Sequence, residues 1–303
     1  MKLAVLAHPD TWHFRDLQRA AGQRHELIAI DYASIFSVIQ KGAQKIKGYR
    51  IDGDCFDLES ADAVLVRAMP AGSLEQVVFR MDLLGRLSAN GTPVVNSPRS
   101  IEAAVDKYLS LALMRECGIR IPDTVVCQSG SSATLAFEQL GGDVLSKPIF
   151  GSQGRGIVRL DNPAAAREHF ESNTSGIFYL QRFVDHGGQD LRVMVIGDRT
   201  TGMRRSNSGH WLTNASHGAT CAPAELSDDQ RNAALAAAKA VGASYAGVDI
   251  IEDRLGNNLV VEVNACPGWR ALKNSTGLDV AGELLELIAD ISNSENKTLS
   301  SSG

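Results

Sequence analysis

The sequence predicts a mixed α/β and α+β protein, with a small parallel βαβ lobe at the N-terminus and two α+β lobes after it. In the first third, short β-branched runs alternate with helical patterns, which is typical of a parallel sheet. From about residue 124, strand runs joined by turns predominate, which favours antiparallel sheets. At 303 residues the chain is long for one core, so we expect two or three lobes around a shared site.

The composition is that of a soluble globular protein, with 44% hydrophobic and 21% charged residues. A formal net charge of -5 argues against nucleic acid as a partner. Five cysteines without CxxC or CxxH spacing predict neither a zinc site nor a disulfide framework, which favours a reducing cytoplasm. No run reaches the roughly 18 to 20 apolar residues that a membrane span requires, so we expect no membrane association.

The first lobe is predicted to span residues 1–97. Its strands are expected at 3–7, 27–30, 63–66 and 93–95, with a helix at 74–87 whose apolar residues recur at helical spacing.

A helical linker opens the second predicted lobe, residues 98–185. Ser97 can cap a helix whose first turn accommodates Pro98. Asp106 can start a second helix that runs to residue 117, with Gly118 as its stop signal. The strands expected after the linker lie at 124–126, 144–149, 156–160 and 178–184.

The third predicted lobe, residues 186–291, contains a strand at 191–196 and an alanine-rich helix at 228–241. Two further strands, 245–251 and 259–263, flank a polar turn and predict a hairpin. The tail, 292–303, is rich in serine, asparagine and charge and is predicted to be disordered.

Three oxygen-bearing side chains of this hairpin predict a metal site. Glu262 and Asn264 lie two apart in an apolar strand and therefore leave the same face, and Asp249 lies in the opposite strand. Buried carboxylates need a compensating cation, and oxygen ligands suit Mg²⁺. The alternative is that both acids pair with lysines or arginines on a solvated sheet face.

A glycine-rich loop next to a lysine predicts a phosphate site. Lys147 ends an apolar strand, and the loop 151–156 follows, in which glycines let backbone NH groups approach phosphate oxygens. The loop lies between strands and lacks GxxxxGK, so it is not a Walker A loop. The alternative is an ordinary glycine-rich hairpin turn, and Lys107 alone has the character of a surface lysine.

Other charged positions are weaker signals when taken singly. The segment 181–184 could offer backbone groups to a planar base, although its periodicity alone favours a plain buried strand. Asp190 and Arg192 lie two apart on one strand, and Arg204 begins an Arg-Arg pair. Each places charge where an anionic intermediate needs it, but isolated residues of this kind are more often surface ion pairs.

The order of these pieces resembles the ATP-grasp superfamily, specifically its RimK-like branch of carboxylate-amine ligases of the alpha-L-glutamate ligase type. The similarity covers about residues 94–281, and the run 262–268 with Asp249 upstream is its most specific part. It implies an ATP-grasp fold, with a pre-ATP-grasp lobe and two α+β lobes enclosing ATP. It also implies Mg²⁺ (or Mn²⁺), with two ions expected.

The resemblance assigns roles residue by residue. Asp249, Glu262 and Asn264 would hold the metal, and Arg192, Arg204 and Asn214 would face an acyl phosphate. The nucleotide would be contacted by Lys107, Lys147, Gly151, Ser152, Gln153, Gly154 and Gly156 at the phosphates, by Gln181, Arg182, Phe183 and Val184 at the adenine, and by Asp190 at the ribose.

One departure bears on the substrate. Leu212 stands where relatives that modify a ribosomal protein carry an arginine, which argues against such a substrate. The runs 67–77 and 267–272 look more like ligases of tetrahydromethanopterin or methanofuran-type cofactor biosynthesis. The resemblance therefore implies amide formation between an amino acid such as glutamate and a small pterin or furan C1-carrier, by an enzyme that forms dimers or tetramers.

Three alternatives stay open: glutamylation of a protein C-terminus, a catalytically silent ATP-binding regulator, and a sugar- or amino-acid-binding protein without ATP. The N-terminal lobe, including His8, Trp12 and His13, is expected to contribute to the acceptor or acid pocket.

Overall fold

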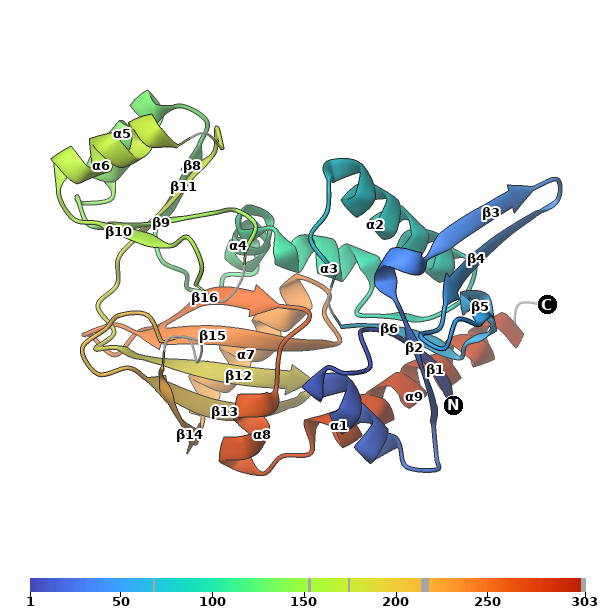
Figure 1. Ribbon diagram of the computed structural model, residues 1–303. Coiled ribbons are helices and arrows are strands. Elements are labelled where there is room, and N and C mark those ends of the chain that lie inside the picture. Colours follow the sequence, from blue (N-terminus) through green and yellow to red (C-terminus); the bar gives the residue numbers. More distant parts are fainter. Residues whose placement is uncertain (68, 152–153, 174, 214–217, 301–303) are drawn as a thin grey trace.

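The computed structural model describes residues 1–67, 69–151, 154–173, 175–213 and 218–300, with side chains to residue 294. Figure 1 shows a small lobe carrying α5 and α6, a five-stranded sheet, and an N-terminal lobe on the opposite side from the small lobe. No helix in these residues is long and apolar enough to cross a membrane.

The N-terminal lobe is built on a parallel sheet, as the sequence predicts. In sheet order its strands are β2 (Glu26–Ile30), β1 (Lys2–Leu6), β6 (Ala63–Val66) and β7 (Val94–Val95). The helices of this lobe are α1 (Trp12–Ala21), α2 (Leu74–Ala89) and α9 (Val280–Ser300).

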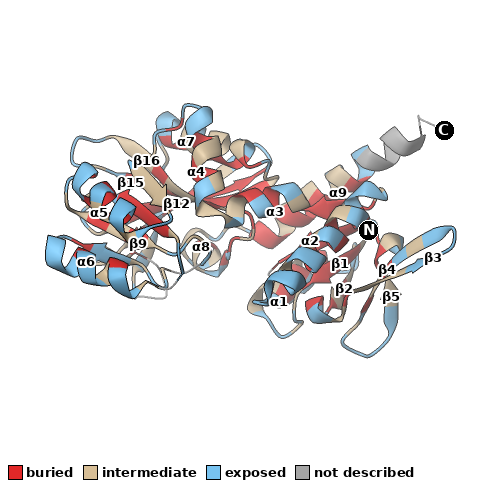
Figure 2. Cartoon of the chain, turned by 90° about the horizontal axis from the view of Figure 1, so that it is seen from above, coloured by how far each residue is buried: buried red, intermediate tan, exposed pale blue. Residues whose placement is uncertain are grey.

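Alternating residues of β1 enter two different cores, because successive side chains of a strand leave opposite faces. Leu3 and Val5 pack with buried residues of α1 and α9, whereas Ala4 and Leu6 pack with those of α2. The sheet is therefore covered by helices on both faces, which explains its nearly continuous apolar strands. Figure 2 shows these strands as buried elements between partly exposed helices.

Two linker helices begin where the capping residues predict. Ser97 accepts a hydrogen bond at the start of α3 (Pro98–Val105), and Asp106 accepts two at the start of α4 (Lys107–Glu116). Both helices contribute buried residues to the core of the five-stranded sheet, so they pack with the third lobe although the sequence groups them with the second.

The small lobe is an antiparallel sheet with two helices on one face. Its strands, in sheet order, are β10 (Val158–Leu160), β9 (Val144–Lys147), β11 (Phe178–Arg182) and β8 (Thr124–Cys127). The helices are α5 (Gly130–Gln139) and α6 (Pro163–Ser172), which enclose a separate core with the sheet.

The third lobe is a fully antiparallel sheet whose two faces differ in chemistry. Leu191 and Val193 of β12 alternate with Asp190 and Arg192, and only the first pair joins the core under α7. The polar pair lies on the opposite face. The elements, in sheet order and then along the chain, are β14 (Thr220–Ala224), β13 (Arg199–Ser206), β12 (Gln189–Ile196), β15 (Tyr245–Glu252), β16 (Asn258–Asn264), α7 (Asp228–Ala240) and α8 (Arg270–Thr276).

Several elements are not predicted from the sequence. They are α1, α8, α9, β13, β14, the two short helices η1 (Tyr32–Ser34) and η2 (Leu58–Ser60), and a three-stranded antiparallel sheet of β3 (Phe36–Gln40), β4 (Ala43–Tyr49) and β5 (Cys55–Asp57). The three-stranded sheet extends from the lobe, and most of its residues are partly or fully exposed, so it lacks the apolar runs that mark buried strands.

The C-terminal tail also differs from its prediction of disorder. Helix α9 continues through Ser300, and residues 301–303 lie outside the described chain. Its first turns bury Leu284 and Ile288 in the N-terminal core, and Ser292 donates a 3.0 Å hydrogen bond to the carbonyl of Asp62. Once the packed turns have nucleated the helix, each added residue costs little, which explains the extension.

Candidate active site

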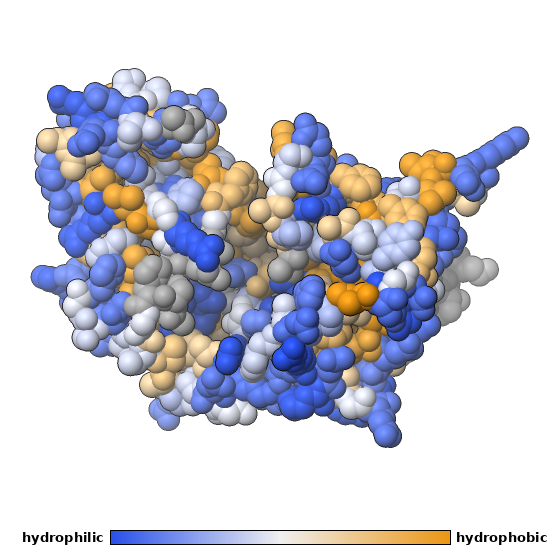
Figure 3. Space-filling view, viewed as in Figure 1, coloured by the Kyte–Doolittle hydropathy of each residue, from blue (hydrophilic) through white to orange (hydrophobic). Residues whose placement is uncertain are grey.

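A cleft with about 760 Å³ of empty volume lies between the small-lobe sheet and the polar face of the five-stranded sheet. Figure 3 shows the molecule hollowed next to the small lobe. Most of the predicted site residues line this cleft: Lys107, Lys147, Gly154, Gln181, Arg182, Phe183, Val184, Asp190, Asp249 and Glu262.

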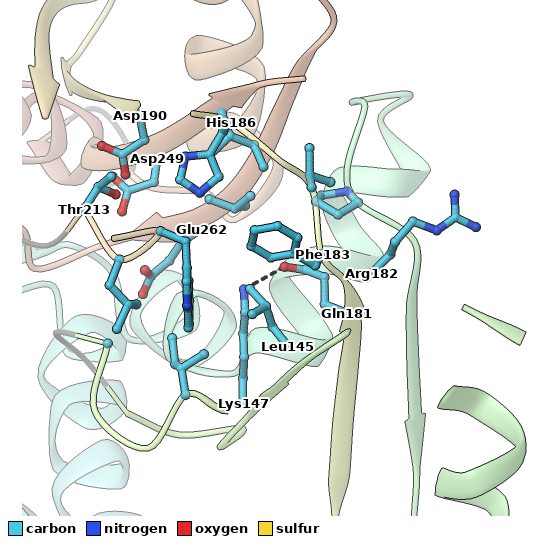
Figure 4. A pocket seen from close by; sticks show the side chains of 18 of the residues that line it. Leu145, Lys147, Gln181, Arg182, Phe183, His186, Asp190, Thr213, Asp249 and Glu262 are labelled. Carbon is cyan, nitrogen blue, oxygen red and sulfur yellow. Dashed lines mark hydrogen bonds between the residues drawn. The ribbon is translucent and has the colours of Figure 1, made fainter. Parts of the chain in front are cut away.

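The two predicted acids of the hairpin lie side by side at the cleft. Asp249 of β15 and Glu262 of β16 are direct partners in the antiparallel ladder, so both side chains leave the same face. Figure 4 shows both carboxylates directed toward the space that Lys147 enters from the small lobe.

Asp249 is neutralised by two arginines. Arg192, its partner on β12, donates from Nη2 to Oδ2 at 2.8 Å and from Nε to Oδ1. Arg205 Nη2 lies 3.0 Å from the same Oδ2. Burial acts to raise the pKa of Asp249, but the two guanidinium groups outweigh it and hold that pKa below its usual range. The carboxylate is therefore ionised at neutral pH.

Arg205 also binds Asp190, and this arginine is missed by the sequence prediction. Its Nε donates to Asp190 Oδ1 at 2.7 Å, and its Nη2 donates to Oδ2. The predicted Arg204 leaves the other face of β13, is exposed, and donates to Gln189 Oε1 at 3.3 Å. Adjacent residues of a strand point in opposite directions, so only one member of the Arg-Arg pair reaches the cleft.

Two lysines face the acids from the opposite side. Lys147, at the end of β9, donates to Gln181 Oε1 at 2.6 Å. Burial lowers its pKa to about 8, Lys107 acts in the same direction, and Glu262 and Asp249 oppose the shift. Lys107, the first residue of α4, donates to the carbonyl of Gly151 at 3.1 Å, and burial lowers its pKa while Glu262 opposes this.

The predicted adenine-facing segment contributes unequally. Gln181 is buried and bridges Lys147 and Thr124 Oγ1. The side chain of Arg182 points away from the cleft (Figure 4) and pairs with Asp123 at 3.0 Å, so only its backbone can serve a ligand. Phe183 stands in the cleft wall under the guanidinium of Arg159, whose Cζ lies 3.6 Å from the ring centre.

The glycine-rich loop is only partly described. Gly154 and Gly156 have φ values of 73°, a left-handed conformation that favours glycine. Gly154 lines the cleft, whereas Gly151 and Gly156 do not. Ser152, Gln153 and the predicted Asn214 lie outside the described residues.

Further cleft residues come from segments without a strong sequence signal. His186 follows the segment 181–184, and Trp211 and Thr213 belong to the connection between β13 and β14. Trp211 packs edge-on against Phe183, with ring centres 6.2 Å apart. The sequence signal for this connection is the family resemblance at Leu212 and Asn214.

The comparisons with known proteins decide the family. The RimK-like ATP-grasp domain matches residues 104–288, more than half of the chain. The chain belongs to the RimK-like ATP-grasp family. It is therefore an ATP-grasp ligase, and the match includes both lysines and the acidic hairpin.

Relatives extend the similarity to nearly the whole chain. A tetrahydromethanopterin:alpha-L-glutamate ligase of Methanosarcina acetivorans is 31% identical over 95% of this chain and 98% of the relative. A probable alpha-L-glutamate ligase of Mannheimia succiniciproducens is 31% identical over 94% of this chain and 97% of the relative.

Solved structures confirm the ATP-grasp fold. The ATP-grasp ligase PsnB, solved with a minimal precursor, Mg and ADP, has a TM-score of 0.73 at 22% identity and covers 96% of this chain and 98% of its own. A RimK domain ATP-grasp protein of Sphaerobacter thermophilus has a TM-score of 0.70 at 22% identity, over 95% and 100%.

The residues of this ATP-grasp cleft fit a magnesium ion in part. No hydrogen bond or salt bridge reaches the Glu262 carboxylate from the described residues, which leaves it available as a ligand. Asp249 Oδ2 contacts both arginines, whereas Oδ1 accepts from Arg192 Nε alone among the described residues, so Oδ1 is the oxygen of Asp249 that retains a lone pair for a metal. Asn264 does not line the cleft, and its Oδ1 accepts from the Cys266 backbone NH at 2.8 Å. Glu262 is thus the best-placed ligand of the predicted set.

Proposed function

We propose that this ATP-grasp ligase joins L-glutamate, or a similar amino acid, to the carboxylate of a small-molecule acceptor through an acyl phosphate. The observation that carries the proposal is the opposition of Lys107 and Lys147 to Glu262 and Asp249 across one cleft. Cations on one wall and oxygen ligands on the other suit a triphosphate with its metal.

The first step transfers the γ-phosphoryl group. A carboxylate oxygen of the acceptor attacks the γ-phosphorus of ATP, ADP leaves, and an acyl phosphate forms. Lys147 would stabilise charge on the transferring phosphate, and Glu262 would hold Mg²⁺, which supplies charge neutralisation when bound. Asp249 holds Arg192 by two hydrogen bonds at the same face, which keeps that guanidinium in place for the acyl group.

In the second step the amine attacks the acyl carbon. A tetrahedral oxyanion forms and then expels inorganic phosphate, which retains the former carboxylate oxygen. Arg192 is the group we assign to the oxyanion. We assign to Arg205 the role of facing the acyl phosphate, which the sequence gives to Arg204. Arg204 leaves the opposite face of β13 and is exposed.

The substrate class rests on the relatives. A protein 31% identical over 95% of this chain is named for transfer of glutamate to tetrahydromethanopterin, which supports a pterin-like acceptor and an α-linkage. Leu212 lines the cleft, and the absence of the arginine that relatives modifying a ribosomal protein carry at this position weakens the case for an acidic peptide terminus as the acceptor. A peptide acceptor is the competing possibility, since PsnB was solved with a precursor peptide.

The test is ADP release by the full chain with Mg-ATP, L-glutamate and a panel of acceptors. The panel contains a reduced pterin carrying a terminal carboxylate, a furan analogue and a peptide ending in glutamate. We expect turnover that requires both the amino acid and a ring-bearing acceptor, with a product heavier by one glutamyl residue. Turnover with the peptide alone would replace the small-molecule proposal, and thermal stabilisation by Mg-ATP without any turnover would favour a silent regulator.

A further inference from the structure

Arg67, the first residue after β6, joins the N-terminal lobe to both ends of the acidic hairpin. Its Nη1 donates to Tyr245 Oη, at the start of β15, at 3.1 Å. Its Nη2 donates to the carbonyl of Pro267, just beyond β16, at 2.9 Å. Its guanidinium carbon lies 4.3 Å from the centre of the Trp269 ring. One side chain thus contacts the segments before Asp249 and after Glu262.

The cost of this arrangement suggests a role beyond stability. Arg67 is 7% exposed, and its Nε is buried without a hydrogen-bond partner among the described residues. A buried donor without a partner costs free energy, because it has lost its hydrogen bond to water. Nε therefore adds no stability, whereas both Nη groups are fixed on partners at the ends of the hairpin. A buried group without a partner calls for an explanation, and positioning of the hairpin is one.

The contact at Pro267 leads directly to Arg192. A Cβ atom built on Gly247 would lie 2.9 Å from Pro267 Cβ and 3.0 Å from Arg192 Nη1. Pro267 Cβ and Arg192 Nη1 therefore both border the side-chain position of Gly247, which places Pro267 next to the Arg192 guanidinium. Arg192 in turn binds both oxygens of Asp249.

We infer that Arg67 is a positioning residue for the ligase reaction: it fixes Pro267, and through Pro267 it fixes the Arg192 guanidinium at the reacting acyl group. The inference rests on the proposed function of Arg192. Neither Arg67 nor Arg192 lines the cleft that contains Lys147 and Glu262, so we expect Arg67 to affect the step at the acyl group and to leave ATP binding unchanged.

Arg80 provides a matched control. It is also buried in the N-terminal lobe, donates to a proline carbonyl (Pro70, 2.7 Å) and lies over an aromatic ring (Tyr32, 5.8 Å). All of these contacts stay within the N-terminal lobe. Arg67→Met and Arg80→Met remove the same kinds of contact, but only the first change reaches the hairpin.

The experiment measures kcat, the KM for ATP and the melting temperature of the wild type, Arg67→Lys, Arg67→Met and Arg80→Met. For the Arg67 variants we expect kcat to fall roughly 10- to 100-fold, with the KM for ATP changed less than about 3-fold. Arg80→Met is expected to lose melting temperature but to keep kcat per folded molecule. Guanidinium ion at non-denaturing concentration should raise the kcat of Arg67→Met, whereas equal NaCl should not.

Two outcomes overturn the inference: an unchanged kcat for Arg67→Met, or an equal kcat loss in Arg80→Met. Should Arg67→Met not fold, Tyr245→Phe removes the partner of Nη1 and is expected to lower kcat in the same direction. Hydrogen exchange separates this inference from the proposed function because it needs no substrate. Peptides covering residues 259–269 should exchange faster in Arg67→Lys than in the wild type and Arg80→Met, and equal exchange refutes the contact path even if turnover fails for other reasons.

Discussion

The adjacent residues Arg204 and Arg205 allow one sharp test of the site. We predict that Arg205→Met destabilises the protein by about 3–5 kcal/mol, because it strands the buried Asp190 and removes one of two partners of Asp249. Arg204→Met removes only a 3.3 Å contact of an exposed side chain, so its cost should stay within about 0.5 kcal/mol. Methionine retains much of the apolar stem in both variants. The assay is urea unfolding of both variants and the wild type.

The pH dependence makes this prediction specific. Burial already raises the pKa of Asp190 above its usual value in the wild type, although Arg205 opposes this shift. In Arg205→Met that opposition is lost, so the folded-state pKa of Asp190 rises further above the unfolded value. A raised pKa means that the folded state binds more protons, so stability grows as pH falls. The deficit should therefore be smaller at pH 5 than at pH 8. Equal losses for the two arginines, or a deficit independent of pH, would refute the assignment of Arg205 to the cleft.

Three further predictions concern Lys147 and Glu262 of the cleft and His13, which does not line the cleft. The affinity for ATP should fall as pH rises through about 8, because Lys147 loses its proton there, and Lys147→Arg should remove this dependence in a titration from pH 6.5 to 9.5. Glu262→Gln should lower amine-dependent ADP release by at least about 100-fold, and retained turnover contradicts the assignment. The free energy of unfolding should fall by no more than about 1 kcal/mol, because the change removes an attraction to Lys107 and Lys147 but no hydrogen bond or salt bridge from the described residues. Burial lowers the pKa of His13 to about 4, so the unfolded state binds more protons than the folded state between pH 4 and 6.5. Acidification across that window should destabilise the wild type in urea unfolding, and His13→Gln should flatten this dependence. An unchanged profile excludes the imidazole of His13, whose Nε2 accepts from the Trp269 backbone NH, as its source.

The sequence predicts the parts of the site that depend on alternation within one strand or across one hairpin. Asp249 and Glu262 are two such positions, and the structure brings them together as direct ladder partners. The caps at Ser97 and Asp106 are likewise local signals and mark the observed helix starts.

What the sequence does not predict depends on register between separate elements. Arg204 and Arg205 are equivalent candidates until the pairing of β13 with β12 sets Arg205 opposite Asp190. Arg67 lies 200 residues from the carbonyl that it holds, so no local pattern reports the contact. Strands β3 and β4 are largely exposed, so their sequences need no continuous apolar run. The pattern that marks a buried strand is therefore missing from them.

Transfer of oxygen from the acceptor to phosphate tests the central claim most directly. The acceptor carboxylate is labelled with ¹⁸O, the full chain is given Mg-ATP and L-glutamate, and the released phosphate is analysed by mass spectrometry. An acyl-phosphate ligase transfers one ¹⁸O atom to each phosphate as the amide forms. Unlabelled phosphate released together with amide product would contradict the mechanism.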